Sequence, residues 1–100
     1  MVLLGGNIEL IGFEKLRNNE LVVIKKMVGS FVKSVSEGKN FKKCCLTLLN
    51  PDRADKEMYK LQLMFEFDTI YIAAVEDTNL YFGLDNVCKS IERQLEKQLQ

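Results

Sequence analysis

The sequence predicts an α+β fold in which four strands and two helices follow in the order β-α-β-β-β-α. Two segments carry apolar residues at spacings of three and four, which is the periodicity of an amphipathic helix. Shorter segments alternate apolar and polar residues, as strands buried on one face do. A chain of 100 residues suffices for one such core. We therefore expect a single domain over residues 1–100, with a four-stranded mixed sheet and both helices packed on one face.

The first two elements are a short strand and a long helix. The alternation of Asn7–Ile11 predicts the strand, with every second residue on the same face. Asn18 or Asn19 can cap the N-terminus of the helix that follows. The apolar stripe of this helix comprises Leu21, Ile24, Val28, Phe31, Val32 and Val35. Gly29 lies inside it and costs about 1 kcal/mol relative to alanine.

Three further strands are expected in the middle of the chain. Alternation places them at Phe41–Leu49, Met58–Phe67 and Ile70–Val75. The segment 50–56 between the first two contains the one proline of the chain and is expected to form a polar loop. Residues 68–69 are expected to form a tight reversal, so that the last two strands pair as a hairpin.

The final helix has the clearest pattern. Thr78 or Asn79 can cap it, and its last turns reach close to the C-terminus. Its apolar stripe comprises Leu80, Leu84, Val87, Cys88, Ile91 and Leu95. Away from this stripe, Lys89, Arg93 and Lys97 recur at intervals of four and advance by about 40° per step. This basic stripe has two interpretations, which are a ridge that contacts phosphates and an ordinary solvated helix face.

The composition argues against catalysis. Lys plus Arg and Asp plus Glu both number 14, so bulk positive charge is not available for binding nucleic acid. The absence of histidine excludes a Ser-His-Asp or Cys-His triad, a histidine-ligated zinc and a histidine general base. The three cysteines form no CxxC pair and are expected to be thiols in a reducing cytoplasm. We expect no catalytic residues, no metal, no cofactor and no enzymatic activity.

The distribution of apolar residues indicates a cytoplasmic protein. The N-terminus lacks the basic region of a signal peptide. No stretch approaches about 18 uninterrupted apolar residues, which a membrane-spanning helix would need. We therefore expect neither secretion nor a membrane partner.

Residues 79–97 resemble the closing helix of the ribosome hibernation factor family, which includes hibernation promoting factor and protein Y. Members of the family commonly read Asp-Met-Tyr-Ala-Ala-Ile-Asp at the start of this helix and Leu-x-Arg-Gln-Leu-x-Lys towards its end. The matching residues here are Tyr81, Asp85, Arg93, Gln94, Leu95 and Lys97. The order of elements and the length also match the short form of the family. Asn79 replaces the opening Asp, and Ser90 replaces the usual Lys, with Lys89 one place earlier.

The resemblance implies a translational inhibitor that binds the small ribosomal subunit under stress or in stationary phase. Such a protein lies in the mRNA and tRNA channel and contacts rRNA phosphates with basic residues of both helices. The residues that this implies for rRNA contact are Lys25, Lys26, Lys33, Lys89, Arg93 and Lys97. The implied partners are the small subunit and its rRNA, with no small-molecule substrate, and the protein is expected to be a monomer off the ribosome. A neutral chain can present a basic face if acidic residues gather in loops such as 52–57 and 76–77.

Two other functions are compatible with the same order of elements. A double-stranded RNA-binding module also places three antiparallel strands between helices, but residues 76–77 are acidic where it would need a lysine cluster. A protein-interaction or assembly module would instead use the sheet face that the helices leave open. The residues expected on that face are Phe41, Met58, Met64, Ile70 and Ile72.

Overall fold

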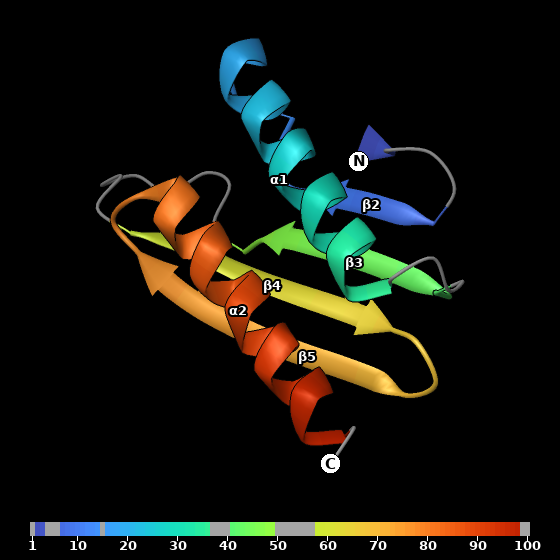
Figure 1. Ribbon diagram of the computed structural model, residues 1–100. Coiled ribbons are helices and arrows are strands. Elements are labelled where there is room, and N and C mark those ends of the chain that lie inside the picture. The colour runs from blue at the N-terminus through green and yellow to red at the C-terminus, as the bar shows by residue number, and fades with distance from the viewer. Residues whose placement is uncertain (1, 4–6, 15, 37–40, 50–57, 99–100) are drawn as a thin grey trace.

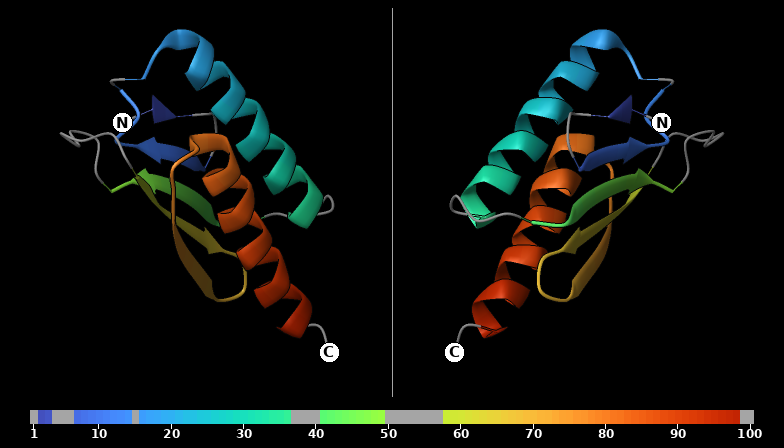
Figure 2. Two further views of the ribbon diagram at one scale, coloured as in Figure 1. Left: turned by 90° about the vertical axis from the view of Figure 1, so that its left-hand side faces the viewer. Right: turned by 90° about the vertical axis from the view of Figure 1, so that its right-hand side faces the viewer.

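A computed structural model describes residues 2–3, 7–14, 16–36, 41–49 and 58–98 of the chain. Its elements are β1 (Val2–Leu3), β2 (Ile8–Ile11), α1 (Asn18–Ser36), β3 (Lys43–Leu48), β4 (Tyr59–Glu66), β5 (Ile70–Asp77) and α2 (Leu80–Gln98) (Figure 1). Both helices cover the same face of the sheet, so the molecule has two layers (Figure 2). The predicted α+β fold and its order of elements are confirmed, and the loop expected at 50–56 lies outside the described residues.

The strands form one mixed sheet in the order β1-β2-β3-β4-β5. β2 and β3 are parallel, whereas β3 with β4 and β4 with β5 are antiparallel. The reversal predicted at residues 68–69 is present, because the Phe67 N–H donates to the Thr69 carbonyl at 3.0 Å. The two-residue strand β1 pairs antiparallel with β2 at the edge of the sheet and is an addition to the four predicted strands.

The core lies between the covered face of the sheet and the two helices. Every second residue of β3 and, from Leu61 onwards, of β4 is buried, as alternation predicts. At the centre of this layer, the ring of Phe65 contacts three other rings. It lies 5.9 Å from Phe31 on α1, 5.5 Å from Phe41 before β3 and 6.1 Å from Phe67 after β4, measured between ring centroids. This aromatic contact joins α1 to the middle of the sheet.

The prediction that Phe41 lies on the open sheet face is wrong. Its ring stacks on Phe65 and packs against the core. The side-chain amide of Asn7 donates to the carbonyls of Phe41 and Lys42, at 2.6 and 3.1 Å. These hydrogen bonds hold the segment before β3, which begins at Lys43, so the alternation of the strand does not extend back to Phe41.

The N-terminal cap of α2 is the predicted residue, whereas the cap of α1 lies one residue before the predicted position. Asn79 caps α2 as predicted, because its Oδ1 accepts the N–H groups of Tyr81 and Phe82 at 2.9 and 3.0 Å. In α1 the cap is Arg17, one residue before the predicted asparagines, since its carbonyl accepts the Leu21 N–H at 2.9 Å. Glu20 then reaches back to the Arg17 N–H at 3.2 Å, as in one half of a capping box.

Two glycines should respond to alanine in opposite directions. A Cβ at Gly29 on α1 would have no neighbour within 4 Å, whereas one at Gly12 would lie 2.6 Å from the carbonyl oxygen of Leu48. Gly12 also has φ of 87°, which alanine adopts only with strain. We expect Gly29→Ala to raise the free energy of unfolding by about 1 kcal/mol and Gly12→Ala to lower it. Urea denaturation measures both, and a stabilised Gly12→Ala would contradict this backbone at the end of β2.

The three cysteines should differ in reactivity. Cys44 and Cys88 are buried, and burial raises the pKa of each thiol to about 12, so neither supplies a thiolate at neutral pH. Cys45 faces the open side of the sheet and is only partly buried. A reagent that reacts with free thiols by disulfide exchange should label one cysteine per native chain and all three cysteines after denaturation. Cys45→Ser should remove the native reaction, and labelling that persists in this variant would mean that Cys44 or Cys88 is accessible in the native protein.

Candidate nucleic-acid interface

The six basic residues predicted to contact RNA all lie on the helix layer (Figure 2). They are Lys25, Lys26 and Lys33 on α1 and Lys89, Arg93 and Lys97 on α2. Lys25 is partly buried beside the apolar stripe of α1, and the others are exposed. Each helix therefore presents basic side chains on the side that points away from the sheet.

On α2 the three basic residues differ in their partners. Lys89 Nζ lies 2.9 Å from Asp85 Oδ2 in an i,i+4 ion pair. The hydrogen bond to Asp85 and its negative charge raise the pKa of Lys89, with a smaller contribution from Glu92. Arg93 Nε donates to the Lys89 carbonyl at 3.4 Å. Among the described residues, no carboxylate lies within 4 Å of Arg93 or Lys97, so their charges lack a direct counter-ion there.

The residues of α2 that match the hibernation-factor pattern divide into two groups. Gln94 Nε2 donates to the Ile72 carbonyl of β5 at 3.0 Å, and Leu95 packs against the core. Asp85 holds Lys89, and Tyr81 is partly buried against the core. These four residues therefore make contacts within the domain. Of the two matching basic residues, Arg93 has the hydrogen bond to the Lys89 carbonyl, and both Arg93 and Lys97 are exposed.

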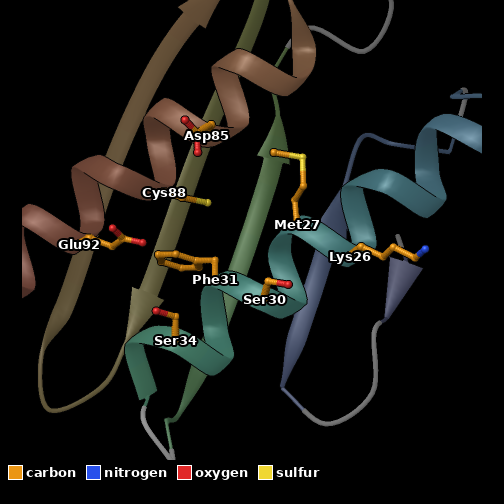
Figure 3. A pocket seen from close by; sticks show the side chains of 8 residues that line it. All are labelled: Lys26, Met27, Ser30, Phe31, Ser34, Asp85, Cys88 and Glu92. Atoms are coloured by element: carbon orange, nitrogen blue, oxygen red, sulfur yellow. The ribbon is translucent and has the colours of Figure 1, made fainter.

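A groove of about 410 Å³ separates the two helices (Figure 3). The residues that line it are Lys26, Met27, Ser30, Phe31, Ser34, Asp85, Cys88 and Glu92. Asp85 and Glu92 both lie on the side of α2 that faces α1, whereas the amino group of Lys26 points away from α2 (Figure 3). The basic residues therefore form two separate ridges with carboxylates between them. Asp85 and Glu92 are seven residues apart and flank the apolar stripe, which is the sequence signal for this acidic side.

The groove between the helices contains a buried thiol and carboxylates from α2. Cys88 is the one thiol that lines it, and burial raises the pKa of this thiol to about 12, which keeps it protonated at neutral pH. In the described part of the chain, no three His, Cys, Asp or Glu side chains are grouped so that they could hold a metal ion. No described helix is long and apolar enough to cross a membrane.

The open face of the sheet carries part of the apolar patch predicted for it. Ile70 and Ile72 on β5 are 54% and 52% exposed. Met58 and Met64 are only partly buried, and Phe41 belongs to the core instead. The patch is therefore concentrated on β5.

The sequence matches no protein-family profile and no curated protein sequence. Two solved structures are similar in fold. A ribosomal subunit interface protein from Coxiella burnetii superposes with a TM-score of 0.68 at 10% identity, over 93% of this chain and 97% of that one. The N-terminal domain of Thermus thermophilus protein Y gives a TM-score of 0.62 at 17% identity, over 92% and 98%. This chain has the protein Y fold. The fold implied by the resemblance of α2 is thus confirmed over nearly the whole length of protein Y's N-terminal domain.

The structural part of the α2 motif should be separable from its basic part. Gln94→Ala removes the hydrogen bond to the edge strand β5 and should lower the free energy of unfolding by about 0.5–1.5 kcal/mol. Asn86→Ala, at an exposed position of the same helix, should cause no such loss. Thermal denaturation measures both. Equal stability of Gln94→Ala and the wild type would show that the contact with Ile72 contributes nothing in solution.

Proposed function

We propose that the protein is a ribosome hibernation factor that binds the small ribosomal subunit through its rRNA and inhibits translation under stress or in stationary phase. The proposal is supported by the agreement between the fold and the α2 motif. The fold matches a ribosomal subunit interface protein and protein Y over more than 90% of each chain, and the α2 motif had indicated the same family. At 10% and 17% identity, the motif and the fold are nearly independent lines of support.

The proposed action needs no chemical step. A rigid domain that occupies the mRNA and tRNA channel blocks both ligands by excluded volume. Its affinity comes from Lys and Arg side chains that replace the counter-ions of rRNA phosphates. Structured RNA is recognised mainly through its shape and backbone, for which a two-layer domain with basic ridges is suited. The protein then acts in the cytoplasm as a single domain over residues 1–100, without cofactor or substrate, and as a monomer off the ribosome.

The two basic ridges suggest how the rRNA is contacted. Lys26 and Lys33 lie on α1, and Arg93 and Lys97 lie on α2 beyond the acidic side of that helix. A phosphate backbone that crossed the groove between the helices would meet Asp85 and be repelled. We infer that each ridge contacts a separate segment of rRNA, as expected for a domain wedged between RNA elements.

A protein-interaction function is the second candidate, because Ile70 and Ile72 leave an apolar surface on the open face of β5. Clean monomers at high concentration and no loss of ribosome binding after Ile70→Lys would argue against it. A double-stranded RNA-binding module has less support, since Glu76 and Asp77 stand at the end of β5, before α2. A gel shift with plain duplex RNA distinguishes that function from ribosome binding.

Removing the basic ridge of α2 should weaken binding to small subunits. Arg93→Gln with Lys97→Gln should lower the slope of log affinity against log salt by roughly 1.5 to 2. Sedimentation with purified small subunits at several salt concentrations gives this slope. The control is Lys43→Gln, which removes one positive charge from the open sheet face, where Lys43 pairs with Glu9 at 3.2 Å.

Three outcomes would contradict parts of this proposal. A wild-type protein that fails to sediment with small subunits even at low salt rules out the function. An equal loss in Lys43→Gln and the double variant would mean that net charge matters and the ridge does not. Loss of helicity in the double variant would show that Arg93 and Lys97 support the fold.

A further inference from the structure

Phe82 is a side chain that the fold does not use. It lies in the first turn of α2 and is 66% exposed, more than any other large apolar side chain among the described residues. Its backbone N–H is held by Asn79, so the position is well ordered although the ring is bare.

The ring of Phe82 lines up with two cations of the same helix. At about 100° per residue, Lys89 and Arg93 each fall within about 20° of Phe82 around the α2 axis. At about 1.5 Å per residue, they lie about 10 and 16 Å further along it. The ridge defined by Phe82, Lys89 and Arg93 points directly away from the core stripe. A single exposed apolar residue is ordinary, but an aromatic ring at the head of a basic ridge is a specific combination.

This combination fits a short single-stranded segment of RNA. Unpaired bases stack on exposed aromatic rings, and the adjoining phosphates contact Lys and Arg. The charges around the ridge also set a direction. Glu76 and Asp77 lie just before α2, and Asp85, which pairs with Lys89 at 2.9 Å, lies one turn after Phe82. These carboxylates would repel a phosphate near Phe82, although they do not repel an uncharged base. The base therefore belongs at the N-terminal end of the ridge, and the phosphates belong towards Arg93.

We propose that Phe82 and Arg93, with Lys89 between them, form a subsite for a short unpaired rRNA segment, in which one base stacks on Phe82 and the phosphates that follow it reach Arg93. The inference rests on the proposed function, because it assigns a contact within the same RNA complex. It adds a contribution to affinity that arises from stacking and therefore differs from the ionic contacts in its response to salt. The salt dependence separates the two kinds of contact.

The first test is the affinity for purified small ribosomal subunits. Phe82→Ala should weaken binding about 5- to 100-fold at fixed salt, with the slope against log salt unchanged. Phe82→Leu keeps an apolar side chain without a π-face and should lose a similar factor, whereas Phe82→Trp should retain affinity. The matched control is Ile70→Ala, on the open sheet face, where the side chain is 54% exposed.

The second test uses fluorescence, because the chain contains no tryptophan. Phe82→Trp introduces the one tryptophan of the chain. Its emission, taken as the difference from a parallel titration of the wild type, should be quenched when small subunits are added and restored by high salt. In Ile70→Trp the emission should not change. Circular dichroism confirms that each variant is folded, as expected for substitutions at exposed positions.

The outcomes distinguish the subsite from the proposed function. If the wild type binds and Phe82→Ala binds equally well, the subsite is overturned while the ribosome-binding function stands. If Phe82→Leu keeps wild-type affinity, the site needs no aromatic face and base stacking is overturned. An unquenched Phe82→Trp overturns base stacking as well. If the wild type does not bind small subunits, both proposals are wrong.

Discussion

The packing of the apolar stripe of α2 against β4 and β5 is the contact on which the candidate interface depends. Leu84, Val87 and Ile91 are buried beneath the helix, so its rotation about its own axis is fixed. Asn79 caps the start of the helix, and the hydrogen bond from Gln94 to the Ile72 carbonyl holds its last turns against β5. Both contacts fix the helix in the same orientation. Because the buried side cannot turn, the opposite side is presented to solvent as one continuous ridge. The charged residues act as a surface only because the core holds them in register.

Local periodicity was sufficient to predict most of the fold, since each strand and helix buries one side and the spacing of apolar residues reveals that side. It could not reveal contacts that depend on residues distant in sequence. Phe41 was placed on the wrong face because Asn7, 34 residues away, bonds the backbone before β3 and ends the alternation there. The two-residue strand β1 forms because Val2 and Leu3 pair with β2, and two residues carry no periodicity.

The same limit applies to the candidate interface. The spacing of Lys89, Arg93 and Lys97 predicted an exposed stripe, and all three are exposed. A single helix pattern shows which residues flank the apolar stripe, but it does not show which flank faces the neighbouring helix. That depends on the order of the strands, which places α1 beside the flank that bears Asp85 and Glu92. The basic residues therefore form two ridges and not the single patch that counting charges would suggest.

A chain with equal numbers of acidic and basic residues gains little from long-range attraction to RNA, so the proposed binding must depend on where its basic residues lie. Carboxylates in the groove between the helices would repel an RNA backbone that crossed both helices. This repulsion disfavours the binding of non-specific RNA more than the binding of an RNA site that offers two separate segments. Stacking on Phe82 would act in the same direction. It adds free energy only where an unpaired base is available, and salt does not screen it as it screens phosphate contacts. Neutrality and the bare ring can thus serve one purpose, which is selectivity for a particular RNA surface over RNA in general.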